Sequence, residues 1–324
     1  MNLLVTGGAG FIGSAFVRGL LDGRHPGHER AEVTVLDKLT YAGNPANLPL
    51  DHPRLRFVQG DLCDARLVDE LLPGHEAVVH FAAESHVDRS LLGAEQFVLS
   101  NVLGTHHLLE ASARHAVARV VHVSTDEVYG STATGAWDEQ CPLAPTSPYA
   151  VTKAASDLFA QSHWRTSGLE VVTTRCSNNY GPRQHPEKLI PRFVTTLLDG
   201  GQVPLYGDGL HVREWLHVED HCHALRLVLD KGRPGEVYHV GGGTELTNRD
   251  LTTRLLDLCG ADRASVRHVP DRKGHDRRYA LDDTKLREEL GYRPEVDFDE
   301  GLAAVVDWYR DNRDWWQPRH PPES

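Results

Sequence analysis

The sequence predicts an α/β protein built on a doubly wound parallel sheet, followed by a smaller mixed α/β domain. Apolar runs rich in β-branched residues occupy residues 2–6, 32–37, 54–58, 76–83, 119–124 and 169–175. Stretches with helical spacing lie between several of these runs, notably 94–116 and 147–167. Near-continuous apolar strands that alternate with helices are typical of a parallel sheet covered on both faces. After about residue 177, proline and glycine become frequent and the alternation ends, which indicates a second region.

Length and composition narrow the class of protein. The 324 residues are enough for about two domains, and we expect 1–177 plus 211–245 to form one and 178–210 plus 246–324 the other. A net charge of −12 argues against a general nucleic-acid binder. No apolar run approaches the ~20 residues that cross a membrane. Five scattered cysteines without C-x-x-C spacing, and no signal-peptide pattern, favour free thiols in the cytoplasm.

The first strand leads directly into the glycine-rich segment "TGGAGFIGS". Gly7, Gly10 and Gly13 give the spacing G-x-x-G-x-x-G, and Gly8 also allows G-x-G-x-x-G. Glycine is needed there because the backbone turns sharply and approaches a pyrophosphate, while the following helix offers free N–H groups and its positive end. The position between a strand and a helix is the context that this motif requires. The segment therefore predicts a Rossmann-type dinucleotide site.

Two acidic residues follow the next strands of the predicted sheet. Asp37 closes the second strand, where a carboxylate can accept hydrogen bonds from the adenosine ribose and repel a 2′-phosphate. This favours NAD over NADP, although the positive charge of the neighbouring Lys38 weakens the exclusion of the NADP 2′-phosphate. Asp61, after the third strand, can meet the adenine edge or act as the N-cap of the helix that follows.

Tyr149 and Lys153 form the pattern Y-x-x-x-K in "SPYAVTKAASDLF". Four residues on a helix place both side chains on one face. The ammonium, together with the positive ring of a nicotinamide, is expected to lower the phenol pKa so that tyrosinate can act as a base. Such a pair alone is often a solvated helix face. With the glycine loop and a Ser/Thr-rich strand end, the chain resembles the extended branch of the short-chain dehydrogenase/reductase superfamily over nearly its whole length.

The segment "STDEVYG" at 124–130 narrows the resemblance. Thr125-Asp126-Glu127 is similar to the catalytic triplet of the dTDP-glucose 4,6-dehydratases, whereas related epimerases carry small residues there. Further similar segments are "HFAAESHVDRS" (80–90), "TSPYAVTKAASD" (146–157), "RCSNNYGPRQHPEKLIP" (175–191), "VREWLHVEDH" (212–221) and "DRKGHDRRYALD" (271–282). One departure is visible, since Arg183 and His185 stand where many relatives carry an aromatic residue.

The resemblance implies a dehydratase that converts a nucleoside-diphosphate-glucose, with dTDP-glucose favoured, into a 4-keto-6-deoxy sugar nucleotide. Hydride leaves C4 for tightly bound NAD and returns to C6, while Tyr149 takes the C4 hydroxyl proton. Glu127 is implied as the base at C5 and Asp126 as the acid at C6. Adjacent carboxylates repel each other, so one of them stays protonated more readily. Thr125 is implied to bond the C4 oxygen.

The resemblance also implies the remaining site residues, with the first domain binding NAD and the second the sugar nucleotide. The implied cofactor residues are Gly7, Gly10, Phe11, Ile12, Gly13, Asp37, Lys38, Leu39, Thr40, Asp61, Leu62, Phe81, Ala82, Ala83, Ser85, Asn101, Ser124, Tyr149, Lys153 and Asn179. The implied substrate residues are Ser85, His86, Thr125, Asn178, Lys188, Leu189, Pro204, Tyr206, Arg213, Asn248, Arg272 and His275. Arg213 is the candidate for a bidentate diphosphate contact. The helices 94–116 and 147–167 imply a homodimer.

Other interpretations remain at this stage. A sugar-nucleotide epimerase or decarboxylase of the same superfamily is the nearest, and Asp126 with Glu127 argues against both. A non-catalytic dinucleotide sensor would be expected to have lost Tyr149 or Lys153. His217 and His221, four residues apart, allow a metal site, but the implied reaction needs no Lewis acid and we expect no metal. The choice between dTDP and UDP, and the deoxysugar pathway that is served, stay open.

Overall fold

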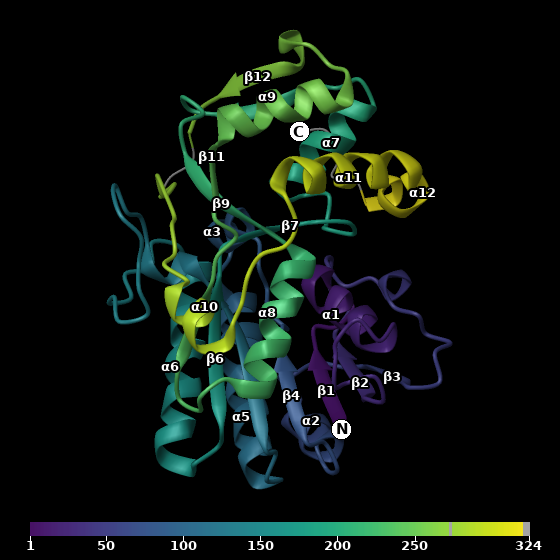
Figure 1. The fold of residues 1–324 in the computed structure, drawn as a ribbon, viewed down its shortest axis with the longest axis vertical. Helices are drawn as coiled ribbons and strands as arrows, with labels where there is room; N and C mark the ends of the chain where they lie inside the picture. Colours follow the sequence, from purple (N-terminus) through teal and green to yellow (C-terminus); the bar gives the residue numbers. More distant parts are fainter. Residues whose placement is uncertain (272–273, 320–324) are drawn as a thin grey trace.

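Seven parallel strands form the central sheet, in the order β10-β6-β5-β4-β1-β2-β3 (Figure 1). The computed structural model describes residues 1–271 and 274–319. The strands are β1 (Asn2–Thr6), β2 (Glu32–Asp37), β3 (Leu55–Gln59), β4 (Ala77–His80), β5 (Arg119–Thr125), β6 (Val171–Cys176) and β10 (Val237–Val240). Six of them lie on the apolar runs seen in the sequence, which confirms the doubly wound parallel fold. The seventh, β10, was not predicted.

The order of the strands reverses at β1. Leu3 of β1 pairs with Val33 of β2 on one side and with Ala77 of β4 on the other. In a doubly wound sheet the carboxyl ends of the strands open a crevice at this reversal, and nucleotides bind there. The glycine loop follows β1 directly, so the fold places it at the mouth of that crevice.

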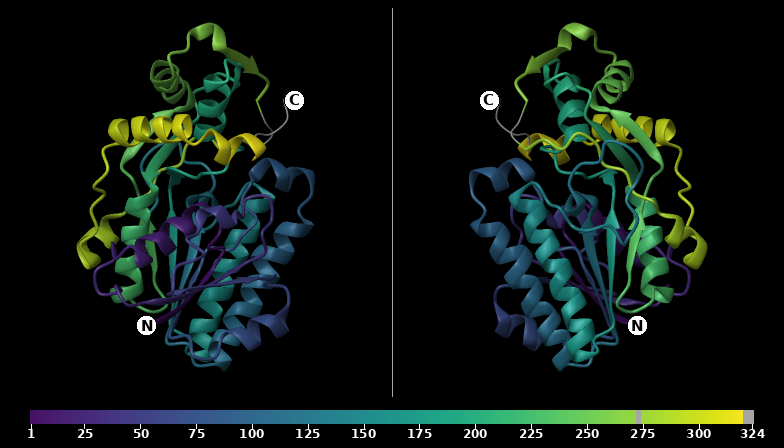
Figure 2. Two further views of the ribbon diagram at one scale, coloured as in Figure 1. Left: turned by 90° about the vertical axis from the view of Figure 1, so that its right-hand side faces the viewer. Right: turned by 90° about the vertical axis from the view of Figure 1, so that its left-hand side faces the viewer.

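Helices cover both faces of the sheet (Figure 2). One face carries α1 (Phe11–Leu21) and α8 (Val218–Lys231), and the other carries α2 (Ala65–Leu71), α5 (Gly104–Arg114) and α6 (Pro148–Ser167). Alternate residues of a strand point to opposite faces. Accordingly Leu3 packs in the core beside α1 and α8, whereas Leu4 packs in the core beside α2, α5 and α6.

The two long helical stretches expected from the sequence differ in regularity. The stretch 147–167 is one helix, α6, with Pro148 in its first turn, Ser147 as the N-cap bonding the Ala150 amide at 3.1 Å, and left-handed Gly168 at its end. The stretch 94–116 is interrupted instead. It comprises α4 (Glu95–Phe97), a π-helical segment η2 (Val98–Leu103) and α5. The short helix α3 (Val87–Leu92) precedes it.

A second, smaller group of elements lies beyond the carboxyl ends of the strands (Figure 1). A three-stranded mixed sheet comprises β11 (Thr244–Thr247), β9 (Val212–His217) and β7 (Asn178–Tyr180), and a parallel pair comprises β12 (Val266–Val269) and β8 (Val203–Tyr206). The helices are α7 (Leu189–Leu198), α9 (Asn248–Cys259), α11 (Phe298–Asp311) and α12 (Arg313–Trp316). Phe193, Leu255 and Leu302 from three of these helices share one buried core.

The domain boundaries expected from the sequence stay a prediction, and two elements bear on them. Strand β9 falls in the range 211–245 but pairs with β7 and β11 in the small sheet. Helix α10 (Thr284–Leu290) falls in the range 246–324, yet its Leu286 and Leu290 pack in the core of the large sheet.

The short 3₁₀ turns are η1 (Pro45–Asn47), η3 (Asp126–Tyr129), η4 (Arg263–Ser265) and η5 (Gln317–Arg319). Within the described ranges, no helix is both long and apolar enough to span a bilayer.

Candidate active site

The glycine loop has the geometry that the sequence motif requires. Gly7 has φ +69°, and a Cβ on it would lie 2.6 Å from the backbone nitrogen of Ala82. A Cβ on Gly13 would lie 2.4 Å from the carbonyl oxygen of Gly7. Both distances are shorter than any real contact allows, so only glycine permits this close packing of loop, strand end and helix α1. The resulting backbone cradle fits the pyrophosphate of a dinucleotide.

Asp37 lies at the end of β2 beside the glycine loop. Its carboxylate accepts hydrogen bonds from the amides of Ala9 at 2.9 Å and Leu39 at 2.8 Å. Burial nevertheless raises the pKa of Asp37, and these two amides only partly oppose the effect. The amides fix the orientation of the carboxylate and leave oxygen lone pairs for ribose hydroxyls, which fits NAD.

Asp61 follows β3 and forms an ion pair with Lys38, which follows β2 at the same end of the sheet. The ammonium of Lys38 is 2.7 Å from the Asp61 carboxylate. Burial opposes ionisation of Asp61, but the hydrogen bond and charge of Lys38, together with the hydrogen bonds from Cys63, lower the Asp61 pKa. The alternative that Asp61 caps the next helix is wrong, because Asp64 caps α2 and accepts from the amides of Arg66 and Leu67. Lys38 is therefore held by Asp61 rather than offered to a 2′-phosphate.

A cavity at the carboxyl ends of the strands gathers nearly all residues implied for the cofactor. Its lining includes Gly7, Gly10, Phe11, Ile12, Gly13, Asp37, Lys38, Thr40, Asp61, Leu62, Phe81, Ala82, Ala83, Ser85, Ser124, Tyr149, Lys153 and Asn179. Two implied residues are placed elsewhere. The Leu39 side chain packs against the core beside the sheet. Asn101 is buried in η2, where its side chain bonds both backbone groups of Glu84 and the Thr152 hydroxyl. Asn101 therefore supports the loop after β4 rather than lining the cavity.

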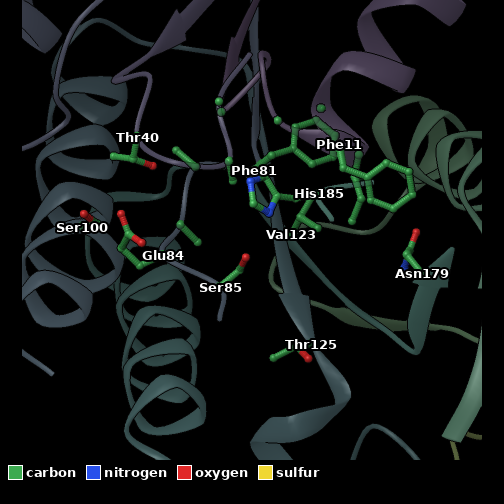
Figure 3. Close-up of a pocket in the computed structure, with 18 of the residues that line it drawn as sticks. Phe11, Thr40, Phe81, Glu84, Ser85, Ser100, Val123, Thr125, Asn179 and His185 are labelled. Carbon is green, nitrogen blue, oxygen red and sulfur yellow. The ribbon is translucent and has the colours of Figure 1, made fainter. Parts of the chain in front are cut away.

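Several residues of the cavity wall were missed by the sequence reasoning. Figure 3 shows three of them, Glu84, Ser100 and His185, with the implied residue Thr40. The wall further includes Gln184 and Glu187. The signal lay in the segment "GPRQHPEKLIP", which matched relatives as a whole, but single-residue roles in a loop between two domains depend on how the loop folds back.

Thr125 and Asp126 form a tight turn where β5 ends and η3 begins. The Thr125 hydroxyl accepts from the Glu127 amide at 3.3 Å and donates to Oδ1 of Asp126 at 3.2 Å. Asp126 is only 2% exposed. Burial, followed by the charges of Glu127 and Glu214, raises its pKa well above the usual range. Burial and the neighbouring carboxylates thus favour the protonated form of Asp126, which is the direction expected for one carboxyl of an adjacent pair.

Tyr149 and Lys153 lie on α6 and face the same cavity. The ammonium of Lys153 donates to the Val123 carbonyl at 2.8 Å, which fixes it behind β5. In the chain without cofactor, burial, and then the Glu127 charge, raises the pKa of the Tyr149 phenol, and a side-chain hydrogen bond with Thr125 opposes the rise only in part. The sequence prediction concerns the phenol beside a bound nicotinamide, so a lowered pKa in that state stays a prediction.

A buried ionic cluster supports the Lys153 helix from behind. One turn after Lys153, the Asp157 carboxylate contacts His122 at 3.1 Å and accepts from Nε of Arg175 at 2.9 Å. Burial opposes ionisation of Asp157, but the hydrogen bond with His122 and the charge of Arg175 lower its pKa to about 2. Burial lowers the Lys153 pKa, and the charge of the same carboxylate opposes this only in part.

A second cavity adjoins the first and gathers the implied substrate residues. Its lining includes His86, Asn178, Lys188, Leu189, Pro204, Tyr206, Arg213, Asn248 and His275. Glu127, Asn178, Glu187 and Lys188 line both cavities. Ser85 and Thr125 line the first cavity only, and Arg272 lies outside the described residues. The second cavity therefore joins the first at the catalytic turn.

Arg213 is held rigidly at the wall of the second cavity. Its guanidinium donates to the carbonyls of Val212 at 2.7 Å and Asp276 at 3.0 Å, and stacks over the Tyr279 ring at 4.4 Å. A guanidinium carries five N–H donors in a fixed plane. A fixed, buried cation of this kind suits a diphosphate.

The histidines of this region have defined contacts. His217 caps α8 by accepting from the Glu219 amide, and His221 contacts Oδ1 of Asn179 at 2.9 Å in the buried interior. Among the described residues, potential metal ligands gather instead at His211, Asp271 and His275. The two imidazoles are stacked with centroids 3.7 Å apart and an interplanar angle of 14°. Nε2 of His211 and Nδ1 of His275 both contact the Asp271 carboxylate, at 3.2 and 2.7 Å. The absence of a metal stays a prediction.

The chain matches known protein families over almost its full length. The family model described as GDP-mannose 4,6 dehydratase matches residues 4–305. A dTDP-glucose 4,6-dehydratase of Streptomyces niveus is 61% identical, with 100% of this chain and 97% of the relative covered. A dTDP-glucose 4,6-dehydratase of Streptomyces antibioticus is 63% identical, with 98% and 95% covered.

Among solved structures, a dehydratase is also more similar to this chain than an epimerase is. The dehydratase DesIV of Streptomyces venezuelae, solved with NAD bound, superposes with a TM-score of 0.97 at 64% identity, with 98% of this chain and 100% of that chain covered. A UDP-glucose 4-epimerase of Thermus thermophilus, also with NAD, gives a TM-score of 0.88 at 34% identity, with 96% and 100% covered. The epimerase shares the fold at much lower identity.

Proposed function

The chain belongs to the GDP-mannose 4,6 dehydratase family and, within it, to the dTDP-glucose 4,6-dehydratases, and from this premise we propose the part that each of its own residues plays. It converts a nucleoside-diphosphate-glucose, dTDP-glucose, into the 4-keto-6-deoxy sugar nucleotide of deoxysugar biosynthesis. The observation that carries the assignment is the acidic turn at the end of β5. There Glu127 lines both the cofactor cavity and the substrate cavity.

The reaction needs one base at C4 and a separate acid–base pair at C5 and C6. Bound NAD supplies temporary storage of a hydride between C4 and C6 of the hexose. Tyr149 takes the C4 hydroxyl proton, and Lys153, fixed on the Val123 carbonyl, keeps a positive charge behind that site. Thr125 positions the C4 oxygen beside the phenol. The resulting ketone acidifies the C5 proton.

Asp126 and Glu127 divide the elimination between them. Burial raises the pKa of Asp126 and so favours its protonated form, and its Oδ2 has no hydrogen-bond partner among the residues that the structure describes. This oxygen can donate its proton to the departing C6 hydroxyl, while Glu127 removes the C5 proton and later returns it. A buried neutral acid beside a base is the arrangement that general acid–base catalysis needs at neutral pH.

The substrate cavity is proposed to hold the nucleoside diphosphate away from the chemistry. Arg213 meets the diphosphate, and Asn248, whose buried Oδ1 has no partner among the described residues, is proposed to meet the nucleotide. Lys188 donates to the Ser85 carbonyl at 2.7 Å and so connects the loop between β7 and α7 to the loop after β4. These roles rest on the lining of the cavity and on the family.

The test is incubation of the protein with dTDP-glucose and, separately, with UDP-glucose. We expect the alkali-induced chromophore of the 4-ketone with dTDP-glucose, and a product that lacks the C6 hydroxyl by mass spectrometry. A product of unchanged mass with an inverted hydroxyl would indicate epimerisation instead. Faster turnover of UDP-glucose would contradict the proposed nucleotide preference.

We further propose a homodimer that works in the cytoplasm. Exposed apolar side chains gather on η2 and α6, the helices implied for dimerisation: Val98, Leu103, Val151, Leu158 and Phe159. An exposed apolar surface of this kind favours association with a second copy. The five cysteines are all free thiols, which suits a reducing compartment.

A further inference from the structure

Arg89 connects helix α3 with two loops beside the cofactor cavity. Arg89, on α3 after β4, donates from Nε to Oε2 of Glu187 at 3.0 Å. Its guanidinium carbon lies 3.9 Å from the centre of the Tyr41 ring, which belongs to the loop after β2. Glu187 belongs to the loop between β7 and α7. Arg89 thus joins segments that are far apart in the sequence and come from both parts of the fold.

His185 extends the same cluster. Its ring meets the Tyr41 ring edge-on, with centroids 5.6 Å apart and planes at 88°, and its Nδ1 accepts from the Glu187 amide at 3.3 Å. Edge-to-face ring contacts of this kind are favourable. The contact therefore ties the loop that carries Glu187 to the loop that carries Tyr41.

The position of the cluster gives it access to the cofactor. Glu187 and His185 line the cofactor cavity, and Figure 3 shows His185 among the side chains of its wall. Tyr41 and Arg89 are not among the lining residues in the part of the chain that the structure describes. Any effect of Tyr41 or Arg89 on the cofactor must then act through the loops that they hold.

We propose that Tyr41, Arg89 and Glu187 form a clasp that keeps the cofactor in place while it is reduced. The inference rests on the proposed function, in which the hydride taken from C4 has to return to C6 of the same sugar. If the reduced cofactor left between these steps, the enzyme would release an oxidised hexose and would lose its hydride. Slow release of the cofactor therefore favours this reaction, whereas an ordinary dehydrogenase has to release its reduced cofactor in every cycle.

The contacts are strong enough to matter for a release rate. Arg89 is half-exposed, but the Glu187 side chain is only 9% exposed, so the pair is partly shielded from water. A cation–π contact together with a partly shielded ion pair corresponds to about a tenfold change in a rate or equilibrium constant. We expect release of the reduced cofactor to be faster by about that factor when the clasp is opened.

The experiment measures dissociation of NADH from the loaded full-length protein. NADH fluorescence is followed after excess NAD is added as a chase, for the parent protein and for Arg89→Met. Arg66→Met is the matched control, because it breaks an exposed pair of the same type, Arg66 with Glu70 at 2.7 Å on α2. We expect about tenfold faster release from Arg89→Met and an unchanged rate from Arg66→Met.

Two variants of Tyr41 distinguish the contribution of its ring from that of its hydroxyl. Tyr41→Ala should release NADH faster, whereas Tyr41→Phe keeps the ring beneath Arg89 and should release it at the parent rate. Combining Tyr41→Ala with Arg89→Met should add little to either single change, because both open the same clasp. During turnover, the opened variants should also release measurable amounts of the oxidised 4-ketoglucose nucleotide.

Two results would overturn the clasp. One is a release rate within twofold of the parent for both Arg89→Met and Tyr41→Ala. The other is equal acceleration by Arg66→Met, which would indicate a general effect of lost surface charge. A failure of the proposed function looks different, since the parent protein would then make no 4-keto-6-deoxy product while its NADH release rate stays measurable.

Discussion

The hydroxyl of Thr125 donates to Oδ1 of Asp126 over 3.2 Å, and this bond ties the end of β5 to the buried carboxyl of the acidic turn. Burial and the neighbouring Glu127 raise the pKa of Asp126 well above its usual range. These surroundings favour the protonated form of Asp126. The proposed division of tasks between the two adjacent carboxyls rests on this difference in surroundings.

The variant Asp126→Asn is expected to remove the acid but keep the base. It should still exchange the C5 proton with solvent and should accumulate reduced cofactor, because the C6 hydroxyl cannot leave as water. Its rate of dehydration should fall by about 10²–10⁴. Deuterium at C5 after turnover in D₂O, read by mass spectrometry of the recovered sugar nucleotide, checks this.

The variant Glu127→Gln is expected to fail one step earlier. It should form reduced cofactor yet incorporate little or no deuterium at C5, because the base for that proton is missing. Its loss of rate should again be about 10²–10⁴. Equal C5 exchange in both amide variants would mean that the division of labour is wrong.

Tyr149→Phe is expected to stop hydride removal while leaving binding nearly intact. The phenyl ring keeps the apolar contacts of a side chain that is 8% exposed, and only the proton acceptor is lost. The absorbance of reduced cofactor in a single turnover should disappear, whereas titration with dTDP should give an affinity close to that of the parent. Normal turnover would refute the role of Tyr149 as the base at C4.

Asp157→Asn is expected to destabilise the whole fold. The change leaves the buried Arg175 without its charged partner, which typically costs about 3–5 kcal/mol in unfolding free energy. The matched control is Asp69→Asn, which breaks the exposed contacts with Arg114 and His115 and should cost much less, because water screens exposed pairs. Urea unfolding of both variants gives the comparison, and equal losses would count against the buried cluster.

The stability of the fold should fall as the pH is lowered from about 6.5 toward 4. Burial lowers the pKa of His25 to about 4, of His239 to about 4 and of His221 to about 3. In this window the unfolded chain binds protons that the folded chain does not, so acid favours unfolding. Each histidine contributes a slope of about 1.4 kcal/mol per pH unit.

The variant His25→Phe isolates one of these contributions. His25 already packs against the Phe16 ring with centroids 5.1 Å apart, and its Nε2 has no hydrogen-bond partner among the described residues. The dependence of the unfolding free energy on pH should become shallower by about 1.4 kcal/mol per pH unit between pH 6 and pH 5. An unchanged slope by urea titration at both pH values would contradict the burial argument.

The proposed dimer can be tested at Leu158, which is 59% exposed on α6. Leu158→Glu would place two charges in the shared helical interface and should weaken association by at least about 10², since burying one leucine contributes about 1.5–3 kcal/mol. Leu50→Glu is the control, because Leu50 is similarly exposed but lies far along the chain from these helices. Light scattering at micromolar concentration should show a monomer only for Leu158→Glu.

The sequence by itself determined the parts of the site that depend on local geometry. Gly7, Gly10 and Gly13 occur at a strand–helix junction, and Tyr149 and Lys153 share a helix face because of their spacing. The acidic turn could be placed for the same reason, since it follows a buried strand. Each of these inferences needs only a few neighbouring residues and a known backbone conformation.

The tertiary structure alone decided which groups change their proton affinity and which loops close the site. The raised pKa of Tyr149 and the protonation of Asp126 depend on burial, which no local spacing reveals. Asn101 and Leu39 turned away from the cavity because of packing against distant segments. Glu187 reached the cofactor wall only because its loop folds back onto Arg89. Such contacts join residues about a hundred positions apart, and only the folded chain brings them together.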